Sequence, residues 1–315
     1  MKFLIHGSIA YDLLLSHEGS FVDAIDPKTL DRLSINYLAQ GFVRHHGGTA
    51  ANISWNLALL GEQPMAIGAV GTDGAEYLTL LKDRGIDLRY VSQSRTAITA
   101  TAIIATDSGE RQISFFHPGA DGEAALPDFS DERDTVALSI ISPRNPMLML
   151  EAARRSTALK IPYLFDPGQV VHAFRQDDFR TALQGSRGLI VNEYEWSLAS
   201  VTLGWDESEV VSQCGMLVRT LGDKGLVILT KKEAVEIPAC PPSRLINPTG
   251  AGDAARAGLL FGCARQWPLV QSGRLAAILG SLVCEQEGTL LDSLDMDLVK
   301  QKAKQTYGEA LPRLQ

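Results

Sequence analysis

The sequence is poor in the features that mark membrane, secreted and nucleic-acid-binding proteins. No stretch approaches the roughly 20 apolar residues that a transmembrane helix needs, and the first apolar run is too short for a signal peptide. Lysine and arginine number 29 against 37 aspartates and glutamates, giving a net charge of -8. Nucleic acids are bound by clustered positive charge. We therefore expect a cytoplasmic protein that binds neither membranes nor nucleic acids.

Cysteine is also scarce, and its spacing excludes the usual metal and redox motifs. The chain has four cysteines, and none lies in a CxxC pair or at zinc-ligand spacing from a histidine. They are Cys214, Cys240, Cys263 and Cys284. The pattern predicts free, mostly buried thiols in a reducing compartment.

Two common nucleotide-binding motifs are missing as well. No Gly-Lys-Ser/Thr follows the glycine-rich loop near residue 250, so this loop is not a Walker loop. No GxGxxG follows the first predicted strand, which argues against a nicotinamide-dependent oxidoreductase.

What the sequence does contain is an alternation of short apolar runs with longer helical patterns. The alternation predicts a parallel sheet covered by helices on both faces, with ligands at the carboxyl ends of the strands. The predicted strands are Phe3–Ile5, Met65–Val70, Val136–Ile141, Tyr163–Phe165, Gly188–Val191 and Gly225–Leu229. The predicted helices are Asn52–Leu60, Glu76–Arg84, Met147–Ala158 and Ser208–Thr220.

Two segments break this rhythm and predict a small β appendage beside the main sheet. Residues 13–43 are polar and rich in turn formers. Residues 96–116 alternate in polarity around Asp107–Gly109, which is typical of an antiparallel hairpin.

The strongest chemical motif is Asn247-Pro248-Thr249-Gly250-Ala251-Gly252-Asp253, which precedes an apolar helical run. The amides of residues 250–253 would lie at a helix N-terminus, where anions are favoured. A carboxylate there would repel a bound phosphate. It makes sense as a base that takes a proton from an attacking hydroxyl while the amides hold the phosphoryl group. The alternative is a glycine-rich turn with Asp253 as a helix cap.

Three further motifs are weaker. Gly47-Gly48 lets the backbone approach a ligand, and Asn52 could bind a polyol, although a tight loop with an asparagine cap explains both residues. Asn192 and Glu195 would share a helical face. Glu195 could hold magnesium through water, or it could be an exposed first-turn acid that the helix dipole favours. The turn Thr220-Leu221-Gly222-Asp223-Lys224-Gly225 could line a nucleotide.

Together, in this order, the motifs resemble the ribokinase, or PfkB-type, family of carbohydrate and nucleoside kinases, from about residue 3 to about residue 290. Gly71-Thr72-Asp73 supports the resemblance. It implies a ribokinase-like three-layer α/β/α core (1–12, 44–95 and 117–315) with a mostly parallel sheet, and a small β lid (13–43 and 96–116). It further implies Asp253 as catalytic base, Gly250, Ala251 and Gly252 as anion hole, and ATP and Mg²⁺ as cofactors. The implied ATP-binding residues are Asn192, Thr220, Gly222, Gly225, Gly250 and Gly252, with Glu195 and Asn192 at the magnesium.

Within the family, the N-terminal half is most similar to the bacterial adenosine kinase branch. The resemblance rests on residues 7–12, 46–53, 114–120 and 192–196. It implies that Asp12 and Asn52 bind ribose hydroxyls and that an aromatic ring of Phe115 or Phe116 lies against the base. The other implied acceptor residues are Ser8, Gly47, Gly48 and Gln169.

Some positions depart from the family pattern. Asn247 stands where the family commonly has the aspartate associated with a monovalent cation, so K⁺ binding there would lack that charge. Ala255 stands where the family commonly has phenylalanine. Ala102 stands where the adenosine kinase branch can have an aromatic residue, and Val170 stands where a polar residue that contacts the nucleobase is expected. A usual glutamine is missing near Gly288.

We therefore expect an ATP-dependent kinase for the 5′-hydroxyl of a nucleoside, adenosine first. A sugar kinase for ribose, fructose or a related polyol is the alternative, and a non-catalytic ligand-binding homologue is another. The exposed strand edges of a lid could be covered in a homodimer.

Overall fold

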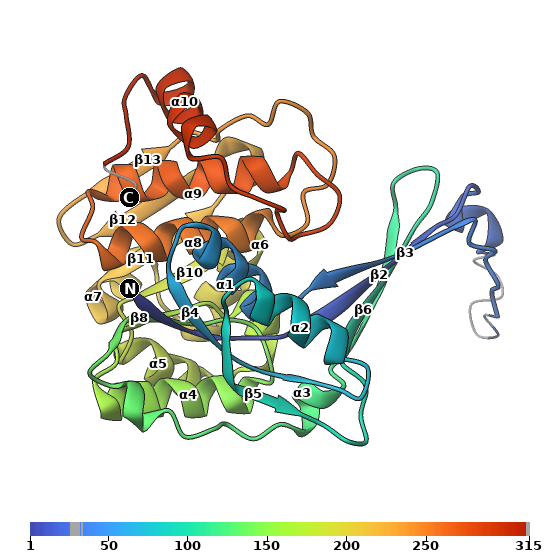
Figure 1. Cartoon of the computed structure of the whole chain (residues 1–315), viewed down its shortest axis with the longest axis horizontal. Coiled ribbons are helices and arrows are strands. Elements are labelled where there is room, and N and C mark those ends of the chain that lie inside the picture. The colour runs from blue at the N-terminus through green and yellow to red at the C-terminus, as the bar shows by residue number, and fades with distance from the viewer. Residues whose placement is uncertain (26–31, 33, 313–315) are drawn as a thin grey trace.

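The computed structural model of the chain describes residues 1–25, 32 and 34–312 (Figure 1). The remaining positions fall within the predicted segments 13–43 and 117–315, and those parts of the two predictions lie outside the described residues. None of the described helices combines the length and apolarity needed to cross a membrane. All four cysteines are free, as predicted.

A nine-stranded sheet forms the centre of the molecule. Its strands run parallel except for β12, which pairs antiparallel with β11 on one side and with the edge strand β13 on the other. In spatial order they are β13 (Ala234–Ile237), β12 (Leu226–Thr230), β11 (Met216–Thr220), β10 (Gly188–Asn192), β9 (Tyr163–Phe165), β8 (Val136–Ile141), β1 (Lys2–His6), β4 (Gln63–Val70) and β5 (Asp87–Gln93).

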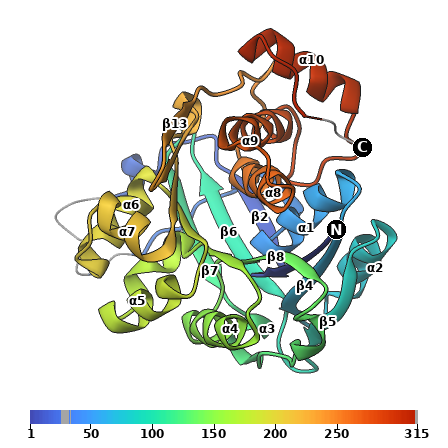
Figure 2. The same ribbon diagram turned by 90° about the vertical axis from the view of Figure 1, so that its left-hand side faces the viewer.

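Helices cover both faces of this sheet, which explains why its central strands are uninterrupted apolar runs (Figure 2). Phe3 and Ile5 of β1 pack on the side of α1, α8 and α9, whereas Leu4 packs on the side of α4 to α7. The helices are α1 (Thr49–Leu59), α2 (Ala75–Asp83), α3 (Ala120–Glu123), α4 (Pro146–Leu159), α5 (Gln176–Gln184), α6 (Glu193–Leu203), α7 (Glu207–Cys214), α8 (Ala251–Ala264), α9 (Leu269–Val283) and α10 (Met296–Tyr307).

The prediction of a single helix over Ser208–Thr220 is wrong. Helix α7 ends at Cys214, and Gly215 turns the chain with a φ of 91°. Residues 216–220 then form β11, which pairs in parallel with β10. Met216, Leu217 and Val218 are buried on both faces of the sheet. A short apolar run of this kind fits a buried helix or a buried strand equally well, and only the sheet partner decides between them.

A second, four-stranded sheet extends from one side of the core (Figure 1). Its order is β3 (Gly41–Gly47), β2 (Ala10–Ser16), β6 (Ala100–Thr106) and β7 (Gln112–His117). The predicted hairpin is present, and the side chain of Asp107 stabilises its turn by accepting bonds from the amides of Gly109 and Arg111, each at 2.9 Å. At the root of the sheet, Asp73 accepts bonds from the amide and hydroxyl of Thr99, each at 2.7 Å.

Candidate active site

Asp253 lies in the first turn of α8, which begins directly after the glycine-rich loop. Gly250 adopts a left-handed φ of 85°, and a Cβ there would lie 2.8 Å from the Cβ of Thr289. A glycine is therefore required for the chain to enter the helix at this point. The amide of Ala251 donates to the carbonyl of Pro248 at 3.2 Å, whereas no backbone partner is seen among the described residues for the amides of Gly250, Gly252 and Asp253. Those three amides fit an anion site.

Asn52, from the other end of the chain, reaches the same point. Its Nδ2 donates to Oδ2 of Asp253 at 2.8 Å. Its Oδ1 lies 2.8 Å from the hydroxyl of Thr289, which also lies 2.7 Å from the carbonyl oxygen of His46. The single hydroxyl proton serves one of these two acceptors at a time. This chain of contacts fixes the amide of Asn52 so that its nitrogen faces Asp253.

The surroundings of Asp253 suit a general base. Burial raises the pKa of Asp253 from 3.8 to about 6, while Arg256 and the bond from Asn52 act to lower it. The carboxylates of Asp166 and Asp12 act in the same direction as burial. A base is most effective when its pKa lies near the working pH, because it is then both ionised and able to hold a proton.

Asp12 lies across the site from Asp253, on β2 of the small sheet. Burial raises its pKa, and His45 opposes that effect. A Cβ on Gly47 would lie 2.5 Å from Oδ2 of Asp12, so the glycine leaves room for the carboxylate. Gly48 has a φ of 93°, and a Cβ there would lie 2.6 Å from the carbonyl oxygen of Ser8. The glycine pair is thus required by contacts within the protein, before any ligand is considered.

The strand register decides which lid residues share a face with Asp12. Asp12 pairs with His45 on β3 and with Ala102 on β6, and Ala102 pairs with Phe116 on β7. Directly paired residues point to the same side of a sheet. Phe116 therefore lies on the face of Asp12, whereas Phe115 lies on the opposite face with Leu13.

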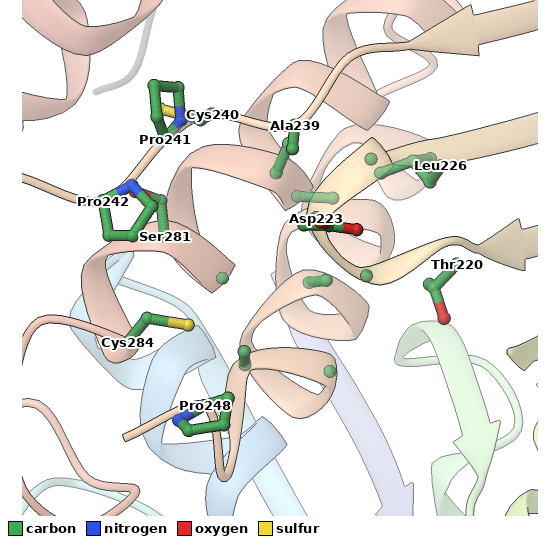
Figure 3. A pocket seen from close by; sticks show the side chains of 18 of the residues that line it. Thr220, Asp223, Leu226, Ala239, Cys240, Pro241, Pro242, Pro248, Ser281 and Cys284 are labelled. Carbon is green, nitrogen blue, oxygen red and sulfur yellow. The ribbon is translucent and has the colours of Figure 1, made fainter. Parts of the chain in front are cut away.

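A pocket of about 680 Å³ opens on the other side of the glycine-rich loop (Figure 3). Of the residues predicted to bind ATP, Thr220, Gly222, Gly225 and Gly252 line it, and Ala251 does so too. Asn192 and Gly250 are not among its lining residues. Much of the remaining wall is apolar. It includes Leu226, Ala239, Pro241, Pro242, Leu245 and Ala276.

Asn192 and Glu195 form a capping box at the start of α6. Oε2 of Glu195 accepts from the amide of Asn192, and Oδ1 of Asn192 accepts from the amide of Glu195, both at 2.8 Å. Burial raises the pKa of Glu195, and the carboxylate of Asp166 adds to the effect. The second oxygen of Glu195 could reach Mg²⁺ through water. Across the described part of the chain, no group of three or more His, Cys, Asp or Glu side chains could hold a metal directly.

The remaining predicted residues have structural surroundings of their own. Oδ1 of Asn247 accepts from the amide of Thr249 at 2.9 Å, so this oxygen already serves the turn. Oγ of Ser8 accepts from the amide of Thr49 at 3.2 Å, at the start of α1. Gln169 is exposed, in a 3₁₀ segment that follows β9.

Sequence reasoning missed four residues of this site: Asp166, Arg256, Thr289 and His45. Asp166 follows directly on the predicted strand Tyr163–Phe165, so its position at a carboxyl end was a signal that could have been used. Arg256 stands alone as a charge within an apolar helical run. Nothing in the sequence marks Thr289 or His45.

Residues 17–296 match the family described as pfkB family carbohydrate kinase. The chain belongs to this family. A nucleoside kinase from Methanocaldococcus jannaschii is 30% identical over 250 residues, which cover 78% of this pfkB-family chain and 81% of that protein. Burkholderia thailandensis nucleoside kinase in complex with inosine superposes with a TM-score of 0.88 at 31% identity, over 98% of this chain and 99% of that one. The same enzyme in complex with ADP-inosine superposes with a TM-score of 0.86.

Membership confirms both the predicted resemblance and the predicted ribokinase-like α/β fold. As a pfkB-family kinase, the chain is a phosphotransferase that acts on an alcohol group. A raised pKa and neighbouring amides without a backbone partner among the described residues make Asp253 the candidate base for such a reaction.

Proposed function

We propose that the enzyme transfers the γ-phosphoryl group of ATP to the 5′-hydroxyl of a purine nucleoside, with adenosine as the first candidate. The single observation that carries this proposal is the row formed by Asp12 and Phe116 on one face of the small sheet. A carboxylate can accept hydrogen bonds from both hydroxyls of a ribose diol. An aromatic ring on the same face can stack on a base.

Two regions would hold the two substrates. The acceptor would lie between Asp12 and Asp253, with its 5′-hydroxyl toward the carboxylate that Asn52 orients. ATP would occupy the pocket lined by Thr220, Gly222 and Gly252, whose apolar walls suit an adenine ring. The triphosphate would then extend toward the free amides at the start of α8.

In this arrangement the protein acts through position and charge. The oxygen of the 5′-hydroxyl attacks the γ-phosphorus, and Asp253 takes the hydroxyl proton. The bond between the γ-phosphorus and the oxygen that bridges it to the β-phosphate breaks, and ADP leaves. The amides of Gly250 and Gly252 stabilise charge on the transferring group. We propose that Glu195 would hold Mg²⁺ through water, and that the bound ion would neutralise phosphate charge.

The acceptor assignment is tested by nucleoside-dependent and sugar-dependent ADP formation from ATP and Mg²⁺. Adenosine, inosine, guanosine, ribose and fructose form the panel. We expect a purine nucleoside to give the highest kcat/KM and its 5′-monophosphate as product. Turnover of the free sugars alone would show a sugar kinase. Tight nucleoside binding without turnover of any acceptor would show a binding protein.

We further propose that a second copy of the chain covers the face of the small sheet opposite Asp12. Two neighbouring rows of this face are apolar except for Arg44 on β3, and Phe42 and Phe115 are 64% and 68% exposed. Leu13, Leu15, Ile103 and Ile113 belong to the same rows. A twofold axis would place identical apolar faces against each other, which closes the assembly as a dimer.

A further inference from the structure

An ion pair that the mechanism above does not use lies near Asp253 and acts on its charge. Asp166 follows β9 at the carboxyl edge of the sheet and is fully buried. It holds Arg256 of α8 by two bonds, from Nε to Oδ2 at 2.5 Å and from Nη2 to Oδ1 at 2.9 Å. Arg256 itself is only 9% exposed. Two parallel bonds of this kind fix the plane of the guanidinium group.

The pair leaves one nitrogen of Arg256 over, and that nitrogen lies at the glycine-rich loop. A Cβ on Gly252 would lie 2.8 Å from Nη1 of Arg256. Among the described residues, Nη1 has no hydrogen-bond partner. Gly252 is one of the residues whose amide is free at the start of α8. The missing side chain of Gly252 thus leaves space for a cationic donor beside the candidate anion site.

The location is unfavourable for an arginine unless anions lie nearby. Arg256 is in the second turn of α8, but its Nη1 lies beside Gly252 in the first turn, where the helix dipole disfavours positive charge. The groups that act on Asp253 are Arg256 on α8, Asp166 after β9, Asp12 on β2 and the amide of Asn52 on α1. Two further titratable groups face this cluster. Tyr77 on α2 interacts electrostatically with Asp253, and Glu195 on α6 interacts with Asp166 and Arg256. The carboxylates outnumber the single guanidinium, and a transferring phosphoryl group would add more negative charge.

Arg256 also acts on Asp253 more strongly than its own partner does. The guanidinium lowers the pKa of Asp253, and this effect exceeds the opposite effect of Asp166. Together with the position of Nη1 beside Gly252, this means that the positive end of the ion pair faces the loop that carries the base. A pair that served packing alone would have no reason to present its cation to this carboxylate and to Gly252.

We infer that Arg256, positioned by Asp166, supplies the fixed positive charge of the phosphoryl-transfer site. It keeps the base ionised in its buried position, and its free nitrogen lies ready to donate to the phosphoryl group beside Gly252. The inference rests on the proposed roles of Asp253 and the loop amides, but it does not depend on which acceptor is used.

Three variants separate this role from simple charge balance in the core. Arg256→Met removes the cation, and Arg256→Lys keeps a charge without the two-bond fork. The double variant Asp166→Asn/Arg256→Met removes both charges, so that no buried carboxylate is left unpaired. Arg154→Met is the control, because Arg154 makes a 2.9 Å ion pair with Asp178 on the exposed side of α4 and α5.

The first measurement needs no acceptor. The carboxyl carbon of Asp253 is followed by ¹³C NMR against pH in the ligand-free protein, with Asp253→Asn to identify the signal. We expect the midpoint to move upward by roughly one to two pH units in Arg256→Met. The midpoint should move less in Arg256→Lys. In the double variant it should still lie above the wild-type midpoint, and in Arg154→Met it should equal the wild-type midpoint.

The second measurement is kcat and KM with the best acceptor of the wild-type enzyme. We expect kcat to fall by about two to three orders of magnitude in Arg256→Met and in the double variant. Arg256→Lys should recover part of the loss, and acceptor binding should change little. A double variant with wild-type titration and wild-type kcat would overturn the inference. If Arg256→Met fails to fold, the double variant alone decides between the two outcomes.

These measurements distinguish the inference from the proposed function. An enzyme that turns over only sugars would disprove the nucleoside assignment, yet the variants could still be compared with that sugar. If the titration midpoint of Asp253 in the double variant equals that of the wild type, Arg256 has no role in the site, even if adenosine is the acceptor.

Discussion

At the scale of single residues, the site depends on one carboxylate whose burial disfavours its ionised form. Asp253 is bonded by Asn52 and surrounded by Asp12 and Asp166, and its pKa is raised to about 6. The same burial that makes it a competent base also makes its ionised form unfavourable in the folded protein. Catalytic rate and folding stability are therefore linked at this position.

Asp253→Asn tests the role in catalysis. The amide keeps the size of the side chain and can still accept the bond from Asn52, but it cannot take a proton. We expect kcat to fall by about two to four orders of magnitude with nucleoside binding retained. Steady-state kinetics and calorimetric titration with nucleoside measure the two quantities. An unchanged kcat would exclude Asp253 as the base.

The same variant should stabilise the fold above pH 6. The raised pKa means that the folded state binds a proton more readily than the unfolded state between about pH 4 and pH 6. In the wild type, stability is thus lost at this residue as pH rises through that window. Asp253→Asn should unfold with a free energy higher by up to about 3 kcal/mol at pH 8, and the difference should vanish near pH 4. Urea unfolding at the two pH values measures it.

The pH dependence of turnover follows from the same group. Only the ionised carboxylate accepts a proton, so kcat/KM for the acceptor should fall on the acid side of a midpoint near pH 6. Asp12 also has a raised pKa, and its protonation would weaken binding of the diol. A profile of kcat should then depend on Asp253 alone, whereas kcat/KM reports both residues. A flat profile between pH 5 and 8 would contradict the assignment.

At the scale of elements, strand alternation separates two adjacent aromatic residues into two roles. Phe116 shares the face of Asp12, and Phe115 lies on the other face. We expect Phe116→Ala to raise the nucleoside KM by about tenfold, because base stacking on an aromatic ring contributes about 1–3 kcal/mol. Phe115→Ala is the matched control and should leave KM unchanged. Equal effects of the two substitutions would show that stacking is not set by the strand register.

At the scale of the whole molecule, the opposite face of the small sheet determines the expected assembly. Its apolar rows expose large side chains, including Phe42 and Phe115. We expect a dimer in sedimentation velocity experiments. Phe115→Glu should shift the protein toward monomer, because it places two charges in an apolar interface. Phe116→Glu, on the other face, serves as the control. A monomeric wild type at micromolar concentration would exclude this interface.

The sequence by itself determined the local structures and the motifs with strong local constraints. Short apolar runs specified β1, β4, β8 and β10, because strands buried on both faces must be apolar throughout. The loop Asn247–Asp253 pointed to a base beside an anion site, because glycines and a carboxylate at a helix start leave few other readings. The hairpin at Asp107–Gly109 followed from its alternation and turn residues.

Only the tertiary structure decided what these pieces do together. The strand Met216–Thr220 was mistaken for helix because its character depends on β10 beside it. Asn52 and Asp253 are 201 residues apart, and no local pattern shows that they share a hydrogen bond. Asp166 and Arg256 are 90 residues apart and form a pair only because the fold brings the end of β9 to α8. Sequence periodicity records which side chains are buried, but the charges that set the pKa of Asp253 come from segments that meet only in the folded chain.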